Sequence, residues 1–243
     1  MYYEEFGDKK NRTIIFLHGA LFVDTFKKQY ILEKQFHLVI PHLIGFGKEA
    51  DRIYSVDQII LELHEIILKL DKKVMMIGFS IGAQLAFEFV NTHPELISKA
   101  IFISPWLIKE QEYLALATGE NLNILRKLKH KGFCYFVGLM NGLSRIQRKE
   151  FSHSIQRINE ESIINMVKES IELKDFHKFG LVTIPMIAIA GKKEDQEMHQ
   201  SVIELSKMNS NCQSIIWEKA GHNIPISYDK RLNQLILDFA NKA

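Results

Sequence analysis

A serine stands between two glycines in the run Gly78-Phe79-Ser80-Ile81-Gly82, directly after an apolar stretch and directly before a helical pattern. A serine at a sharp strand-to-helix turn presents its hydroxyl outward, and glycines two residues to either side avoid collisions inside so tight a bend. A hydroxyl held in this way is suited to nucleophilic attack. A chance Gly-Ser-Gly loop is the alternative, and the strand and helix context argues against it. We therefore predict that Ser80 is a nucleophile.

A histidine that could serve Ser80 as a base lies in Gly221-His222-Asn223, after the last apolar run and before the last helical pattern. An imidazole can take the serine proton and return it near neutral pH. The chain has ten histidines, and His222 is selected by its position. A purely structural histidine is the alternative interpretation.

A carboxylate that accepts a hydrogen bond from the imidazole would hold the ring in the required tautomer. The loop Gly191-Lys192-Lys193-Glu194-Asp195 follows the preceding apolar run and contains two such groups. On the residues alone, both Glu194 and Asp195 are candidates for this acid.

Two backbone N–H groups are expected to stabilise an oxyanion formed on attack by Ser80. Ile81 follows the serine at the start of its helix, and Ala20 follows an earlier strand. Losing one such donor typically raises the barrier by about 3 to 4 kcal/mol. Around the same rim we predict four substrate contacts, namely His18, Gly19, Leu21 and Trp106. For His18-Gly19, a plain strand-ending turn is the alternative.

Short apolar runs rich in β-branched and aromatic residues predict the buried strands that position these groups. They are Thr13–Leu17, His37–Ile40, Lys73–Ile77, Ala100–Ile103, Ile184–Ala190 and Gln213–Trp217. Between them, apolar residues recur at helical spacing from Val56 to Leu70, after Ser80, and from Tyr228 to Phe239. This alternation predicts an α/β fold with a mostly parallel sheet, helices on both faces and a site beyond the carboxyl ends of the strands.

The alternation stops between residues 107 and 180, where the sequence indicates several short helices and no convincing strand. We interpret this segment as an inserted helical cap, with residues 1–106 and 181–243 as the core. Its apolar stretch Gly132–Met140 would either cover an acyl or alkyl pocket or attach the cap to the core.

Composition excludes several function classes. The 31 Lys and Arg nearly balance the 29 Asp and Glu, with no block of like charges and no interleaved basic and aromatic stripe, so no nucleic-acid partner is expected. The first residues lack a signal-peptide pattern and no apolar run could span a bilayer, which predicts a cytoplasmic protein without a membrane partner. Cys134 and Cys212 are far apart and form no CxxC, so neither a disulfide nor a metal site is expected. No cofactor is predicted, and the oligomeric state stays open.

Taken in order, these motifs resemble those of the α/β-hydrolase superfamily over nearly the whole chain, and most closely those of compact bacterial serine hydrolases with a helical cap. The matching segments are His18-Gly19, Pro41–Gly47, the Ser80 motif, His93-Pro94-Glu95, the Gly191 loop and Gly221-His222. The chain order of serine, acid and histidine is also the order of this superfamily. In Pro41–Gly47 and the residue after it, His42 and Lys48 replace the usual Asp and Ser.

The resemblance bears on the acid and on the first strands. The superfamily usually places an aspartate three residues after the loop glycine, and Glu194 holds that position here, with Asp195 one residue later. The resemblance therefore favours Glu194 and keeps Asp195 as the alternative. The amino-terminal segment is shorter than in many members, so the first strands are expected to be abbreviated or missing.

The resemblance implies hydrolysis through an acyl-enzyme, and we interpret the chain as a carboxylesterase-like hydrolase of small or medium esters. One alternative is a carbon–carbon bond hydrolase or lyase on the same triad, which would need a basic side chain such as Arg126, Arg145 or Arg157 to hold a carboxylate substrate. The others are a receptor or binding module with slow turnover, and a partner-binding protein whose serine is no longer used.

Overall fold

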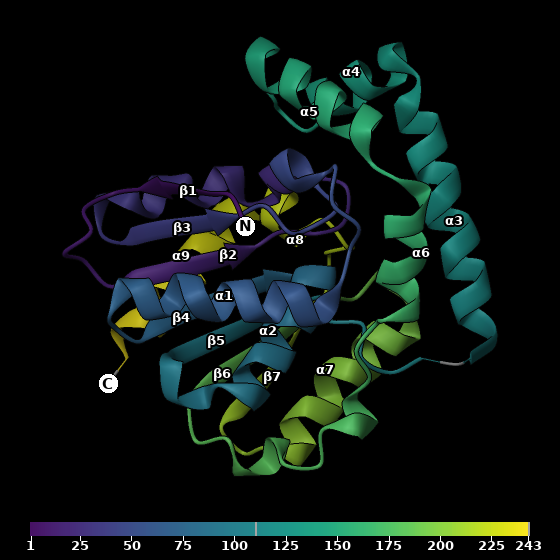
Figure 1. The fold of residues 1–243 in the computed structure, drawn as a ribbon. Coiled ribbons are helices and arrows are strands. Elements are labelled where there is room, and N and C mark those ends of the chain that lie inside the picture. The colour runs from purple at the N-terminus through teal and green to yellow at the C-terminus, as the bar shows by residue number, and fades with distance from the viewer. Residues whose placement is uncertain (110, 243) are drawn as a thin grey trace.

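Seven strands form one sheet in the computed structural model, which describes residues 1–109 and 111–242 (Figure 1). The strand order is β1-β3-β2-β4-β5-β6-β7, and every neighbouring pair except β1 with β3 is parallel. The strands are β1 (Tyr3–Phe6), β2 (Thr13–Leu17), β3 (His37–Pro41), β4 (Val74–Phe79), β5 (Ile97–Ile103), β6 (Met186–Gly191) and β7 (Cys212–Trp217). The predicted mostly parallel sheet is confirmed.

The edge strand β1 is the one strand that the sequence patterns did not predict. It pairs antiparallel with β3, with Tyr3 opposite Pro41, and all four of its residues are only partly buried. Its centre is the acidic pair Glu4 and Glu5, so it lacks the continuous apolar run that identifies the buried strands. One short strand before β2 agrees with the expected abbreviation of the amino-terminal strands.

Helices cover both faces of the sheet because successive side chains of each strand point to opposite faces. In β2, Ile15 and Leu17 belong to the core shared with three helices, α1 (Val56–Leu70), α2 (Ile81–Thr92) and α7 (Gln196–Met208). Ile14 and Phe16 belong to the core on the other face, where the 3₁₀ segment η1 (Val23–Lys34) and the helices α8 (Ile224–Ser227) and α9 (Asp229–Asn241) pack. The remaining 3₁₀ turns are η2 (Gly47–Glu49), η3 (Pro94–Leu96), η4 (Leu173–Asp175) and η5 (Phe179–Leu181).

Among the described residues, four α-helices lie between β5 and β6, and we call them the cap helices. They are α3 (Gln111–Lys129), α4 (Lys131–Met140), α5 (Arg145–Arg157) and α6 (Glu160–Lys168). Figure 1 shows α4 and α5 at the tip farthest from the sheet, with α3 and α6 running back toward the core. At 19 residues α3 is longer than the short helices expected from the sequence.

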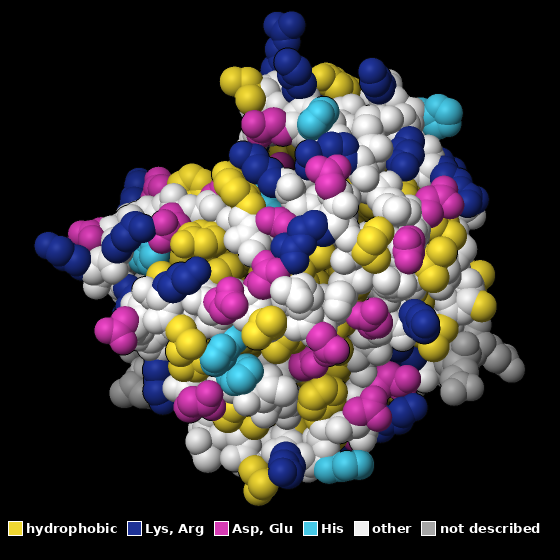
Figure 2. Space-filling view, viewed as in Figure 1, with side chains coloured by type: hydrophobic (Ala, Val, Ile, Leu, Met, Phe, Trp, Pro, Cys, Tyr) yellow, Lys and Arg dark blue, Asp and Glu magenta, His cyan; other side chains and the backbone are white. Residues whose placement is uncertain are grey.

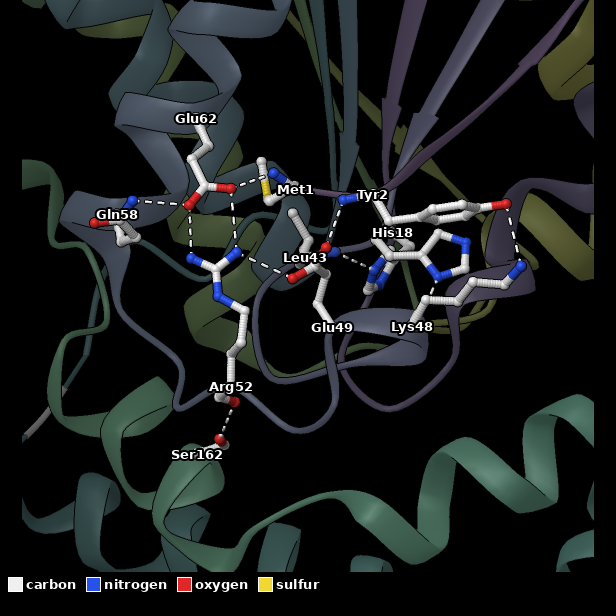
Figure 3. A network of polar contacts seen from close by, with 11 residues as sticks. Met1, Tyr2, His18, Leu43, Lys48, Glu49, Arg52, Gln58, Glu62 and Ser162 are labelled. Atoms are coloured by element: carbon white, nitrogen blue, oxygen red, sulfur yellow. Dashed lines mark hydrogen bonds and ion pairs between the residues drawn. The ribbon is translucent and has the colours of Figure 1, made fainter.

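The cap helix α6 is tied to the core through one buried serine. Ser162 Oγ donates to the carbonyl oxygen of Arg52 over 3.3 Å (Figure 3) and accepts from the N–H of Tyr54 over 3.1 Å. The Arg52 side chain is itself held by Glu49 and Glu62 in the core. The loop between β3 and α1 therefore anchors the cap beside the carboxyl ends of the strands.

Candidate active site

Ser80 occupies the bend between β4 and α2 with a left-handed backbone, φ +55° and ψ −118°. A Cβ at Gly78 would lie 2.1 Å from the carbonyl oxygen of Gly82, and a Cβ at Gly82 would lie 2.1 Å from that of Leu17. No side chain fits at either position. The steric reason inferred from the glycine spacing is therefore present in the structure.

Left-handed backbone is concentrated around this bend. Of the four non-glycine residues with positive φ in the described chain, three follow strand ends at this rim, namely Leu21 after β2, Ser80 after β4 and Ser104 after β5. Each such conformation costs on the order of 1–3 kcal/mol and persists only where the surrounding structure enforces it. Their clustering marks this rim as a strained part of the backbone.

The imidazole of His222 lies between Ser80 and Glu194. Its Nε2 is 3.2 Å from Ser80 Oγ, and its Nδ1 is 2.9 Å from Glu194 Oε2. The ring also packs against Phe79, with ring centroids 4.9 Å apart. Ser80 follows β4, Glu194 follows β6 and His222 follows β7, so their loops leave the same end of the parallel sheet.

The carboxylate of Glu194 is almost completely enclosed, with 2% of its side chain exposed. Its Oε1 accepts from Ser104 Oγ over 2.9 Å and from the N–H of Gly191 over 2.6 Å. Burial by itself would raise the pKa of Glu194, but the hydrogen bonds from His222, Gly191 and Ser104 outweigh burial and hold the pKa below its usual value. Glu194 is therefore the acid that contacts the histidine.

Asp195, the alternative acid, does not contact the imidazole of His222. It stands immediately before α7 and its carboxylate lines the cavity in front of Ser80. Within the described chain, the side-chain hydrogen bonds and ion pairs of His222 are those to Glu194 and Ser80, and Asp195 shares none of them.

Ser104 is a site residue that the sequence patterns did not single out. It is fully buried at the end of β5 with φ +52°, and β5 is the neighbour of β6 in the sheet. Its only sequence signal is a polar residue at the end of an apolar strand, followed by a proline. The loops after β5 and β6 meet because the two strands are neighbours in the sheet, and this strand order cannot be deduced from the local sequence.

The two predicted oxyanion donors are next to the serine. Ala20 and Ile81 line the same cavity as Ser80, and Ile81 is the first residue of α2, where the helix dipole favours negative charge. Within the described chain, neither of their backbone N–H groups donates a hydrogen bond to another protein group. The adjacent Leu21 lines a smaller second cavity that also includes Ser80.

His18 does not contact the cavity, and its predicted role as a substrate contact is corrected here. The side chain is fully buried, and its Nε2 accepts from the N–H of Leu43 over 3.0 Å (Figure 3). Its Nδ1 donates to the carbonyl oxygen of Gly19 over 2.7 Å. Burial lowers the pKa of His18 to about 3, so the ring is neutral. His18 thus connects the end of β2 to the loop that follows β3.

Gly19 and His42 also have structural roles at this end of the sheet. A Cβ at Gly19 would lie 2.8 Å from the ring of Phe79, so the glycine makes room for that ring and does not line either cavity that contains Ser80. His42 Nδ1 accepts from the N–H of Lys48 over 3.0 Å. The two residues that depart from the superfamily pattern are therefore bonded to each other and shape the loop.

The cavity in front of Ser80 has a volume of about 380 Å³. Trp106 lines it together with apolar side chains from α3, α6 and α7, among them Ile124, Met166 and Met198. The smaller cavity, of about 280 Å³, reaches α4 at Val137 and Asn141. Val137 is the one member of the apolar stretch Gly132–Met140 that lines either cavity, so that stretch does not form their roof.

Acidic side chains outnumber basic ones around the larger cavity. Beside Glu194, its walls include Glu120, Asp195 and Glu197, while Lys193 is the one basic side chain from the described residues. This charge balance could not be predicted from the sequence because Glu120 and Glu197 are 77 residues apart in the chain and belong to different helices. It disfavours an anionic group in the pocket.

None of the three arginines considered as carboxylate anchors, all of them in the described chain, lines a cavity that contains Ser80. Arg126 forms an ion pair with Glu160 on the surface, and Arg157 forms one with Asp51. Arg145 is exposed at the start of α5.

The described residues contain no group of three or more His, Cys, Asp or Glu side chains placed to hold a metal ion. Cys134 and Cys212 are both buried as free thiols. No helix in residues 1–109 and 111–242 has the length and apolar character needed to cross a bilayer.

Comparisons with known proteins identify the fold family. Lipase 1 of Psychrobacter immobilis is 24% identical over 247 residues, covering 91% of this chain and 74% of that protein. MenH from S. aureus superposes with a TM-score of 0.75 at 18% identity, over 98% of this chain and 97% of that chain. An esterase from Exiguobacterium antarcticum superposes with a TM-score of 0.77 at 16% identity, over 99% of this chain and 95% of that chain. Because the family model for the alpha/beta hydrolase fold matches residues 12–165, the chain belongs to the α/β-hydrolase fold family.

Proposed function

We propose that this protein is a serine hydrolase that cleaves small or medium carboxylic esters through an acyl-enzyme. The observation that carries the proposal is the continuous chain of contacts from Ser80 Oγ through the His222 ring to Glu194, at the wall of a cavity. The family, and relatives that are themselves named lipase and esterase, agree with an ester substrate.

In the proposed mechanism, Ser80 Oγ attacks the ester carbonyl carbon and transfers its proton to His222 Nε2. The carboxylate of Glu194 can only accept, so the ring carries its other proton on Nδ1, and the carboxylate stabilises the imidazolium that forms. The N–H groups of Ala20 and Ile81 donate to the oxyanion. The leaving alcohol takes the proton from His222, and water then hydrolyses the acyl-enzyme by the same sequence of proton transfers.

The walls of the cavity support an uncharged acyl group of limited size. A volume of about 380 Å³ is at the lower end of small-molecule sites, and the apolar lining favours aliphatic or aromatic groups. The excess of carboxylates disfavours a substrate that itself carries a carboxylate, and the arginines that a carbon–carbon hydrolase or lyase would use lie elsewhere. We propose the cap, residues 107–180, as the element that sets this selectivity, and a cytoplasmic location stays a prediction.

The test is labelling with a fluorophosphonate probe together with turnover of p-nitrophenyl acetate, butyrate and octanoate. We expect the wild type to react with both. Ser80→Ala should not be labelled, and its kcat should fall at least about 1000-fold, because loss of the nucleophile from another catalytic triad costs about a millionfold in kcat. Ser98→Ala, an exposed serine at the opposite end of β5, is the matched control and should behave as wild type.

Two outcomes would contradict the proposal. A wild-type protein that is folded by circular dichroism but does not react with the fluorophosphonate has no activated serine. Labelling of Ser80 without turnover of any ester would instead favour the lyase or the slow receptor.

A further inference from the structure

Helix α4 exposes apolar side chains on the face that it turns to solvent. Only Cys134 and Gly138 are buried within it, whereas the exposed fraction is 45% for Phe133, 57% for Phe136, 57% for Leu139 and 70% for Met140. A helix that is apolar around its whole circumference is normally enclosed in a core or in a membrane. In the described chain no other element covers this face of α4.

The apolar surface extends to the next helix, because Ile146 at the start of α5 is 73% exposed. We call Phe133, Phe136, Leu139, Met140 and Ile146 the cap-tip surface. Phe133, Phe136 and Met140 are spaced three and four residues apart and so lie in one row along the helix. Single exposed apolar residues are ordinary, but a connected group of large ones at a protruding tip indicates a binding surface.

The charged residues of the segment that contains the cap-tip surface are all basic. Residues 121–149 include no Asp or Glu and seven basic residues, Arg126, Lys127, Lys129, Lys131, Arg145, Arg148 and Lys149. The whole chain has a formal charge of only +2, so this segment is strongly asymmetric. Figure 2 shows Lys and Arg side chains over the cap helices, with hydrophobic side chains among them.

Four of these basic side chains are free to bind an anion. Lys127, Lys131, Arg145 and Lys149 are exposed, and none of them is paired with a carboxylate in the described chain. They form no run of consecutive like charges, because Lys127 lies in α3, Lys131 in α4, and Arg145 and Lys149 in α5. Folding brings them to one end of the molecule.

We propose that the cap-tip surface binds the surface of an anionic lipid bilayer. Apolar side chains of an interfacial helix enter the boundary between headgroups and acyl chains, and basic side chains at its rim bind the lipid phosphates. A second copy of this chain fits less well, because a symmetric contact through this surface would bring two sets of seven basic residues together. At ten residues, α4 lies on a bilayer and does not span it.

The opposite side of α4 faces the candidate active site. Val137 and Asn141 line the smaller cavity together with Ser80 and His222. A bilayer held against the cap tip would therefore lie one helix away from the catalytic cavity. The proposed binding needs no catalysis, so it goes beyond the proposed function and is tested separately from it. It also replaces the sequence expectation of no membrane partner, which was based on a search for spanning segments.

The experiment is co-sedimentation with vesicles of phosphatidylcholine containing one quarter phosphatidylglycerol, compared with vesicles of phosphatidylcholine alone. We expect binding at least about tenfold tighter to the anionic vesicles, and weaker binding as salt screens the lysines and arginines. Ser80→Ala should bind as the wild type does. Equal binding to the two kinds of vesicle, or no binding, would overturn the proposal.

Paired variants separate the apolar and the charged contributions. Phe136→Gln with Leu139→Gln should weaken binding at least about tenfold, whereas Leu181→Gln, 78% exposed but outside the cap helices, should not. Lys131→Gln with Lys149→Gln should weaken it about 25-fold, given the usual effect of each basic residue near a charged membrane. Lys10→Gln, exposed between β1 and β2, is the control for charge.

Folding of each variant is checked by circular dichroism. Unchanged vesicle binding by a folded Phe136→Gln, Leu139→Gln protein would overturn the proposal. So would sedimentation velocity showing a dimer that this double variant dissociates, because the surface would then belong to a second copy of the chain.

Discussion

Ser104 and Glu194 are hydrogen-bonded across the ends of two neighbouring strands, with Ser104 Oγ donating to Glu194 Oε1 over 2.9 Å. This bond and the one from the Gly191 N–H fix one oxygen of the carboxylate, so the other oxygen faces His222. Ser104 touches neither Ser80 nor His222 by any hydrogen bond in the described chain. It therefore acts as a positioning residue for the acid.

Ser104→Ala should lower kcat about tenfold and leave KM nearly unchanged, because a hydrogen bond to a charged group contributes about 1.5–3 kcal/mol. The lost bond is one of those that lower the pKa of Glu194, so that pKa should rise. The carboxylate would then be protonated at a higher pH, and activity on the acidic side should be lost earlier than in the wild type. A pH profile of kcat measures this shift, and an unchanged acidic limb would contradict the assigned role.

Glu194→Gln should reduce kcat by about 1000-fold to 10 000-fold, because an amide in place of the acid favours the wrong histidine tautomer. Asp195→Asn is the matched substitution one residue away and should keep kcat within about threefold, since Asp195 does not contact His222. Steady-state kinetics with one p-nitrophenyl ester compares the two. The assignment of the acid is wrong if both variants keep full activity or if Asp195→Asn loses more.

Gly82→Ala should be strongly destabilising, by about 3 kcal/mol or more, because its Cβ would overlap the carbonyl oxygen of Leu17. Gly119→Ala is the control. Nothing lies within 4 Å of a Cβ built at Gly119 inside α3, so alanine there should stabilise the protein by about 0.5–1 kcal/mol. Urea unfolding measures both free energies, and a Gly82→Ala protein as stable as the wild type would contradict the packing described for the bend.

Glu88 makes the stability depend on pH. Burial, reinforced by the nearby Asp57, raises the pKa of Glu88 to about 7 from 4.5. Between these values the folded protein binds more protons than the unfolded chain, so this group makes the free energy of unfolding fall as pH rises from about 4.5 to 7.

Glu88→Gln should remove this decrease. Because the side chain is partly exposed, the gain at pH 8 should be about 1 kcal/mol, with no gain below pH 4. Urea unfolding at the two pH values provides the measurement, and exposed Glu65→Gln on α1 is the control. A gain that is equal at both pH values would show that charge is not the cause.

The sequence identifies those parts of the site that depend on local chain geometry. The glycines around Ser80, the loop with Glu194 and the loop with His222 each follow a strand whose apolar run is readable, and parallel strands end at one rim. The prediction for His18 was wrong because the direction of a buried side chain depends on the neighbouring loop, here the N–H of Leu43.

The parts that sequence patterns missed depend on which elements pack together. Ser104 reaches Glu194 only because β5 and β6 are neighbours, and the cavity walls come from helices that are remote in the chain. The apolar run of α4 was predicted to cover a pocket or to attach the cap, yet most of it faces solvent. Hydrophobicity alone does not tell whether a helix face turns inward or outward.

The three left-handed residues at the strand ends also affect how much change the protein can tolerate. The strained backbone at Leu21, Ser80 and Ser104 lowers the free energy of unfolding by several kcal/mol in total. A typical domain has a free energy of unfolding of only about 5–15 kcal/mol. The remaining framework must therefore be more stable than the molecule as a whole. A destabilising substitution in the sheet should therefore unfold this protein more readily than it would unfold a protein with the same core and no strained residues. The protein tolerates fewer substitutions than its large buried core suggests.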